Sequence, residues 1–207
     1  MEIDAKVVKD LREKTGAGVM DCKKALAESS GDLEKAVLWL REKGIASAAK
    51  RSGRVASEGT VGCYIHAGGK LGVLVEVNCE TDFAAKGPDF QTLVKEIAMQ
   101  IAATNPRCIR REELAAEIIE QERQIYAQQS AGKPANVIGK IVDGKLDKFY
   151  KEVCLLEQSW VRDPNRTITD LIGEYTAKIG EKLDVRRFSR FQLGEGFDQK
   201  GGAAQAG

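Results

Sequence analysis

Two short segments with strictly alternating apolar residues restrict the fold of this chain more than any other feature of the sequence. A glycine-containing stretch, AGGK at residues 67–70, separates them. Alternation with a period of two is typical of β-strands, and a short connection that contains glycine is typical of a β-hairpin. The pair therefore predicts one antiparallel hairpin. Its alternating residues are Val61, Cys63, Ile65, Val73, Val75 and Val77.

Helical patterns fill most of the chain that follows this hairpin. Apolar residues recur at spacings of three and four in residues 90–101 and 168–179, which predicts two amphipathic helices. A charged segment at residues 111–129 and an amphipathic segment that opens at Pro134 predict two more.

Two further segments have the composition of strands. Residues 153–158, VCLLEQ, predict a buried strand. Residues 184–193 predict a last strand, and its aromatic residues on both faces indicate either burial on two sides or a bulge.

The first 54 residues predict three short helices. Asp4 is a candidate N-cap for the first helix, the second begins at Val19, and Asp32 caps a third that ends at Gly44. Helices this short are marginal alone, so they are expected to bury their apolar sides on one another. Residues 45–54 are expected to be a hinge or an exposed helical extension.

These patterns predict the fold class α+β. The expected domains are a three-helix unit with its linker at residues 1–54 and a small antiparallel sheet packed by helices at residues 55–196. Residues 197–207 contain too little apolar surface to pack, so a mobile tail is expected there.

The composition of the chain argues against several classes of function. The chain has 32 basic and 31 acidic residues and a net charge of +1, so no global field attracts nucleic acid or a membrane surface. No apolar run is long enough to span a membrane. The five cysteines form no CxxC pair, which indicates a reducing compartment and argues against a zinc site. Most of them are expected to be small buried apolar residues.

The sequence contains no recognisable catalytic motif. Its one histidine, His66, follows the first hairpin strand and has no serine or cysteine nucleophile motif around it. Residues 16–24 superficially resemble a phosphate-binding loop but lack the glycine directly before the lysine and follow no strand. We therefore expect a binding protein without catalytic residues, metal or cofactor, rather than an enzyme.

One candidate contact surface lies at residues 14–26, KTGAGVMDCKKAL. Val19 and Met20 follow a glycine turn, and Lys23 lies one helical turn further on. Val19 and Met20 are either ordinary core residues or, together with Lys23, a small contact surface for a helix of a partner.

A second candidate is the stretch ETDFAA at residues 80–85. In one interpretation Thr81 or Asp82 caps a turn while Phe83 packs under the next helix as a hydrophobic staple. In the other interpretation Phe83 is a rigid aromatic wedge that is held out on a loop beside a carboxylate.

A local excess of positive charge leaves two other functions open. Residues 41–54 contain five basic residues and one acidic residue. This segment is either a solvated linker or a docking strip for an acidic partner. A non-catalytic helical adaptor and a nucleic-acid-binding protein that uses this strip remain alternatives.

Four long motifs identify a family resemblance. The segments LREKTGAGVMDCKKAL, GVLVEVNCETDFAAK, GKPANVIGKIVDGKLDKFYKEVCLLEQ and RFQLGEG occur in the order found in translation elongation factor Ts. The resemblance extends from Val7 to Gly196, nearly the whole chain. The chain resembles the short form that is found in some bacterial lineages and plastids.

The resemblance implies a guanine-nucleotide exchange factor for elongation factor Tu. It implies that residues 1–54 form a ubiquitin-associated-like fold that contacts the partner's nucleotide-binding domain through Val19, Met20 and Lys23. It further implies that a loop of the family's Thr-Asp-Phe-Val type dislodges the partner's Mg²⁺. That loop is Thr81, Asp82, Phe83 and Ala84 here.

Two departures from the family pattern concern packing. Ala84, which is smaller, replaces the usual valine of the loop. Ser159-Trp160 stands where the family usually has Pro-Phe, and local repacking without loss of function is expected there. Short forms lack a second core subdomain, and a homodimer would supply the missing surface. We expect no direct binding of nucleotide, nucleic acid or membrane, and a location in the bacterial cytoplasm or the plastid stroma.

Overall fold

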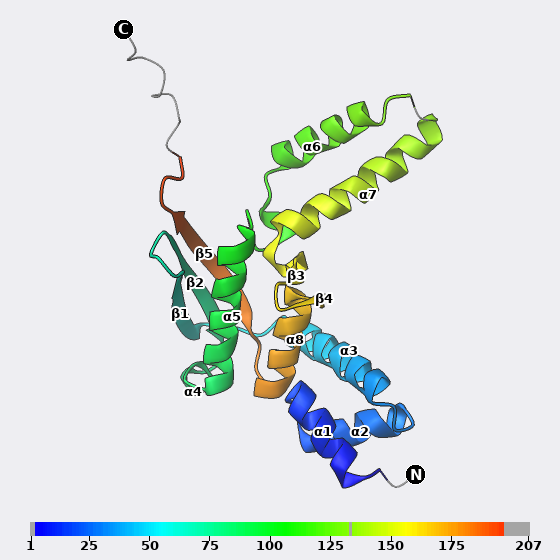
Figure 1. Ribbon diagram of the computed structural model, residues 1–207, viewed down its shortest axis with the longest axis vertical. Coiled ribbons are helices and arrows are strands. Elements are labelled where there is room, and N and C mark those ends of the chain that lie inside the picture. The colour runs from blue at the N-terminus through cyan, green and yellow to red at the C-terminus, as the bar shows by residue number, and fades with distance from the viewer. Residues whose placement is uncertain (1–2, 133, 197–207) are drawn as a thin grey trace.

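The computed structural model describes residues 3–132 and 134–196. Three helices lie at one end, a three-stranded sheet with two covering helices forms the centre, and a helical hairpin projects from the opposite end (Figure 1). The predicted mobile tail, residues 197–207, lies outside the described residues. In this part of the chain no helix is long and apolar enough to cross a membrane.

The N-terminal helices are α1 (Ala5–Thr15), α2 (Val19–Glu28) and α3 (Leu33–Arg51). Both predicted caps are confirmed, because Asp4 accepts a hydrogen bond from the backbone of Lys6 and Asp32 accepts from two backbone N–H groups of α3. The three helices share their own apolar cluster, which is separate from that of the sheet. Its buried residues are Val8, Leu11, Cys22, Ala25, Leu26 and Ala36.

The prediction that the third helix ends at Gly44 is wrong. α3 continues to Arg51, and Gly44 is buried against Gly173 of α8 (Ile168–Ile179). A Cβ on Gly44 would lie 3.0 Å from the carbonyl oxygen of Gly173. The glycine therefore permits a close helix crossing instead of ending a helix, and residues 45–51 are a helical extension.

The central sheet contains β1 (Glu58–Ile65), β2 (Leu71–Cys79) and β5 (Asp184–Gln192) in the order β1-β2-β5, with both neighbouring pairs antiparallel. The predicted hairpin is confirmed. The last strand is also confirmed, and it has a bulge where its pairing with β2 shifts between Glu76 and Val77. Phe188 packs against the core while Phe191 is exposed, so the bulge is present without burial on two sides.

Helices α5 (Pro88–Thr104) and α8 cover one face of this sheet. On β1 the covered face carries Gly62, and a Cβ there would lie 2.2 Å from Cγ1 of Val94. The apolar residues of β1 therefore point to the other face, where Val61 and Ile65 are both 64% exposed. Cys63 is exposed with them, while the other four cysteines are buried, in agreement with the prediction that most of the cysteines are small buried residues.

The prediction of a buried strand at residues 153–158 is wrong. This segment is the end of α7 (Ala135–Val153) followed by a 3₁₀ helix, η2 (Leu155–Glu157). Only an isolated β-bridge joins Cys154 to Cys108. The sequence pattern also missed the small hairpin of β3 (Ser159–Trp160) and β4 (Asp163–Thr167) that follows.

The projecting hairpin consists of α6 (Ala116–Gln129) and α7. Both predicted helices are present, but the first begins at Ala116 and not at residue 111. A 3₁₀ helix, η1 (Arg111–Glu113), precedes it. Arg111 joins the base of the hairpin to the core, because its guanidinium donates to both Glu157 and Asp147. Leu114, Phe149 and Val153 bury a separate apolar cluster at the same base.

Candidate partner-binding site

The loop after β2 contains a one-turn helix, α4 (Asp82–Ala85). Thr81 is its N-cap, because the Thr81 hydroxyl accepts a hydrogen bond of 3.2 Å from the backbone of Ala84. Ala84 and Ala85 are buried against the sheet and α5. We call residues 80–85 the wedge loop.

Phe83 is 90% exposed, the largest exposed fraction among the large apolar residues that the structure describes. The staple interpretation is therefore wrong. Burying a phenylalanine side chain stabilises a protein by about 1.5–3 kcal/mol, and Phe83 contributes none of this to its own fold. Beside it, Asp82 pairs with Lys86 across one helical turn at 2.5 Å.

A distant carboxylate holds the start of the wedge loop. Glu181, in the connection between α8 and β5, accepts hydrogen bonds from the backbone N–H groups of Glu80 and Thr81, both at 3.0 Å. It also accepts a bond of 2.6 Å from the Thr81 hydroxyl. No pattern in the sequence pointed to Glu181, because 100 residues separate it from Thr81.

Glu80 makes the reciprocal contact. Its side chain accepts a hydrogen bond of 2.6 Å from the backbone N–H of Lys182 and bonds from the guanidinium of Arg54. The bond from the Lys182 backbone, followed by the Arg54 guanidinium, lowers the pKa of this carboxyl. Glu80 is therefore an acceptor for both neighbours at neutral pH.

The second candidate surface lies at the start of α2. Met20 is 74% exposed and Val19 is 43% exposed, and Lys23 is exposed beside them. Cys22 of the same helix is fully buried in the three-helix cluster. The alternative that Val19 and Met20 are core residues is therefore wrong.

The turn before α2 contacts the helices that support the wedge loop. Lys178 of α8 packs against this turn, so that a Cβ on Gly16 would lie 3.2 Å from the Lys178 Nζ. The same ammonium group donates to Asp89 in the first turn of α5 at 2.6 Å. One lysine thus contacts both the N-terminal unit and the helix that follows the wedge loop.

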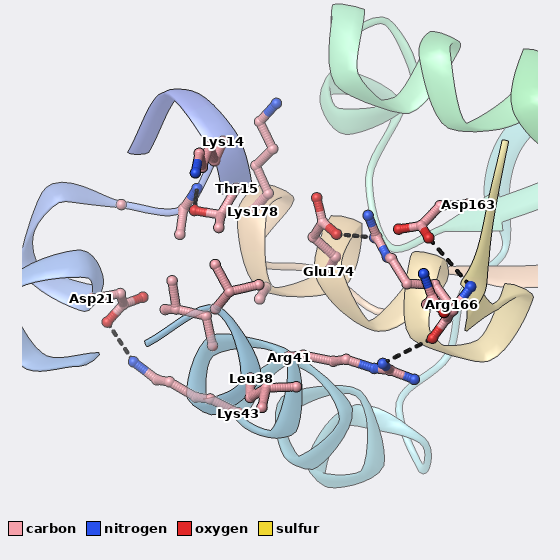
Figure 2. A pocket seen from close by; sticks show the side chains of 16 residues that line it. Lys14, Thr15, Asp21, Leu38, Arg41, Lys43, Asp163, Arg166, Glu174 and Lys178 are labelled. Atoms are coloured by element: carbon pink, nitrogen blue, oxygen red, sulfur yellow. Dashed lines mark hydrogen bonds and ion pairs between the residues drawn. The ribbon is translucent and has the colours of Figure 1, made fainter. Parts of the chain in front are cut away.

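A pocket of about 380 Å³ lies between the N-terminal unit and α8 (Figure 2). Val37 and Leu38 form part of its apolar wall. Charged groups at its edge are paired within the chain: Lys43 with Asp21, and Arg166 with Glu174. The pocket therefore presents apolar surface with a largely neutralised edge.

The one histidine of the chain is exposed, whereas four of the five cysteines are buried. Burial raises the pKa of the Cys154 thiol to about 12 and also raises the pKa of Cys22, Cys79 and Cys108, which keeps these four thiols protonated and weakly nucleophilic. His66 interacts with the hydroxyl of Tyr64 at the exposed end of the hairpin. Within residues 3–132 and 134–196, no three His, Cys, Asp or Glu side chains are grouped as metal ligands.

The basic strip of residues 41–54 is largely occupied by contacts inside the chain. Arg41 pairs with Asp170, Lys43 with Asp21, and Arg54 with Glu80. These pairs remove much of the free charge that phosphate binding would require.

Two exposed apolar surfaces on well-supported elements are typical of one class of protein, those that bind another protein. The family model described as "Elongation factor TS" matches residues 5–195. The chain is 58% identical over 201 residues to Elongation factor Ts of Desulforamulus reducens, covering 96% of this chain and 93% of that protein. It is 56% identical over 202 residues to Elongation factor Ts of Geobacter sulfurreducens, covering 97% and 94%.

A third relative, Elongation factor Ts of Caldanaerobacter subterraneus, is 58% identical over 199 residues, covering 95% of this chain and 100% of its own. The chain belongs to the elongation factor Ts family. This membership confirms the predicted role in translation elongation, that of a nucleotide exchange factor for elongation factor Tu.

Proposed function

We propose that this chain accelerates GDP release from elongation factor Tu by placing Phe83 against the partner's nucleotide-binding domain. The observation that carries the proposal is the 90% exposure of Phe83 on a loop whose start is hydrogen-bonded to Glu181 and whose last two residues, Ala84 and Ala85, are buried. A rigid exposed aromatic side chain is typical of the residues that dominate protein interfaces. Its low conformational entropy means that little free energy is lost when it binds.

The mechanism needs no acid or base from this chain. In a GTPase, Mg²⁺ links the nucleotide phosphates to the protein and requires near-octahedral geometry. A shift of about an ångström in the elements around the ion would weaken its coordination and lower the affinity for GDP. Because binding is reciprocal, GDP and this chain then weaken each other's affinity for the partner by the same factor.

The N-terminal unit supplies the second contact. Val19, Met20 and Lys23 offer exposed apolar surface next to a positive charge, which suits the face of an amphipathic partner helix. We assign this unit a ubiquitin-associated-like fold and set its boundary, with the linker, at residue 54. The remaining domain is residues 55–196. Thr81, Asp82 and Ala84 act with Phe83 by shaping the wedge loop.

The face of the sheet that α5 and α8 leave uncovered is called the open face. We propose that a second copy of this chain binds there. That face carries large apolar residues, and an exposed apolar sheet face is typical of an interface. An isologous pair needs one patch that contacts itself, which this face provides. Its exposed residues are Val61, Ile65, Leu74, Phe191 and Leu193.

The proposed site of action is the bacterial cytoplasm or the plastid stroma, where the partner would also be present. The test measures release of fluorescent GDP from purified elongation factor Tu with wild type, Phe83→Ala and Met20→Ala. We expect fast release with wild type, much slower release with Phe83→Ala, and weaker binding with Met20→Ala. Absence of acceleration by wild type would contradict the proposal and favour a helical adaptor.

A further inference from the structure

The connection between α8 and β5 lies where it can set the direction of Phe83. We infer that Glu181 is a positioning residue for nucleotide exchange, acting through the backbone of the wedge loop, and that Lys182 links the same loop to the end of α3. This inference rests on the proposed function of Phe83. We call Glu80, Glu181 and Lys182 the carboxylate clamp.

Glu181 is itself well anchored. Gly180 before it closes α8 in the left-handed conformation, with φ of 84°, and Leu183 after it is buried in the core. The carboxylate thus extends from a short connection that is held on both sides. Its three hydrogen bonds, two from backbone N–H groups and one from a hydroxyl, involve a charged acceptor and are stronger than neutral ones.

The clamp is closed by the reciprocal contact. Glu80 accepts from the backbone N–H of Lys182, so each segment supplies a carboxylate that binds the backbone of the other. Loss of Glu181 would leave the N–H groups of Glu80 and Thr81 to water. It would also free the Thr81 hydroxyl, which caps α4.

Lys182 extends the clamp to the N-terminal unit. Its ammonium group donates to the carbonyl oxygens of Ser52 at 2.6 Å and Arg54 at 2.8 Å, directly after α3. Lys182 therefore links the wedge loop to the segment that follows α3, while Lys178 links the turn before α2 to the first turn of α5. A partner that binds both proposed contact surfaces, at Phe83 and at the start of α2, therefore binds them at a set distance and orientation relative to each other.

Loss of Glu181 is expected to change the direction of the Phe83 side chain, because little else restrains that side chain. A side chain that is 90% exposed has few contacts of its own, so its direction depends on the backbone of α4. α4 has only four residues and depends on Thr81 for its cap. A misplacement of about 1 Å at a functional group can lower a rate about 100-fold.

The experiment compares Glu181→Ala and Glu181→Gln with wild type in release of fluorescent GDP from elongation factor Tu. We expect release to be about tenfold slower with Glu181→Ala. Glu181→Gln keeps a carbonyl acceptor and should restore part of the rate. Glu117→Ala, which changes an exposed glutamate on α6, is the matched control and should match wild type.

A double-mutant comparison separates positioning from a general loss of structure. In the Phe83→Ala background, Glu181→Ala should have no further effect on release, because the residue that it positions is gone. A structural role would lower the rate in both backgrounds. Amide hydrogen exchange at Glu80 and Thr81 should be faster in Glu181→Ala, while exchange in α5 stays unchanged.

Failure of the Glu181 inference can be distinguished from failure of the proposed function of Phe83. A wild-type rate with Glu181→Ala would overturn the inference while the proposed function stands, and so would an equal loss in the Phe83→Ala background. If wild type itself fails to accelerate release, the proposed function fails, and the inference fails with it. A tenfold loss that disappears in the Phe83→Ala background would support the inference.

Discussion

Gly44 of α3 and Gly173 of α8 lie directly against each other, backbone to backbone, where the two helices cross. Both glycines are buried, and neither is at the end of its helix. A glycine inside a helix costs about 0.5–1 kcal/mol relative to alanine. Here that cost is offset by a close approach that holds the N-terminal unit on the core.

The glycine contact predicts that Gly44→Val destabilises the protein. The new side chain would meet the carbonyl of Gly173, and such overpacking costs about 1–3 kcal/mol. The free energy of unfolding, measured in urea, should fall by that amount. Gly144→Val is the matched control, because nothing lies within 4 Å of a Cβ at that position of α7, and its effect should stay within about 0.5 kcal/mol.

Phe83 is predicted to affect exchange without affecting stability. Phe83→Ala removes a side chain that is 90% exposed, so the free energy of unfolding should change by less than about 0.5 kcal/mol. Phe90→Ala should instead cost about 3–5 kcal/mol, because Phe90 is fully buried in the core. Thermal unfolding of both variants checks this contrast. A large loss of stability with Phe83→Ala would contradict an exposed wedge.

Asp170 is predicted to make stability depend on pH in the acid range. Burial favours a higher pKa, but hydrogen bonds from Arg41 and Thr167 outweigh it and lower the pKa of this carboxyl. The folded pKa is thus below the unfolded value of about 3.9. The stabilisation, about 1–2 kcal/mol, is therefore complete above pH 4 and is lost as the pH falls through the folded pKa.

Urea unfolding of Asp170→Asn and wild type at pH 7 and pH 3 tests this dependence. The difference between the two proteins should be largest at pH 7 and should shrink at pH 3. Asp143→Asn is the control, because its ion pair with Arg123 is exposed and surface pairs contribute little. An Asp170→Asn effect of equal size at both pH values would contradict the prediction.

The open sheet face predicts self-association. Ile65→Arg places a charge on this apolar face and should shift sedimentation in the ultracentrifuge from dimer to monomer. Val55→Arg is the control, since Val55 is 80% exposed but lies before β1. A wild-type protein that remains monomeric at high micromolar concentration would contradict assignment of this face to a second copy.

Local patterns predicted much of this fold because most elements are amphipathic over their whole length. The hairpin of β1 and β2, helices α5 and α8, and the caps at Asp4 and Asp32 all follow from residues close in sequence. Residues 153–158 were misread, because a short buried apolar run does not distinguish a strand from a helix end. Gly44 was misread because a helix-ending glycine and a helix-crossing glycine have the same local sequence.

The candidate site was predictable only in part. The segments of Phe83 and Met20 stood out because apolar residues followed turns, and their exposure in the structure excludes the staple and core interpretations. The support of the site was not predictable. Glu181 and Lys182 belong to an ordinary charged connection, and their partners lie about 100 and 130 residues away in sequence. Contacts of that range depend on the tertiary fold, which no local pattern contains.

The carboxylate clamp continues the hydrogen bonding of the sheet beyond the last paired residues of β2 and β5. Backbone pairing between β2 and β5 stops at Asn78 and Asp184. Beyond that point the side chains of Glu80 and Glu181 take over the hydrogen bonding that two strands would otherwise give each other. The two carboxylates in effect lengthen the ladder of hydrogen bonds up to Thr81, the N-cap of α4. A segment that would fray in solution thus inherits the stiffness of the sheet, and Phe83 stands at the tip of that extension.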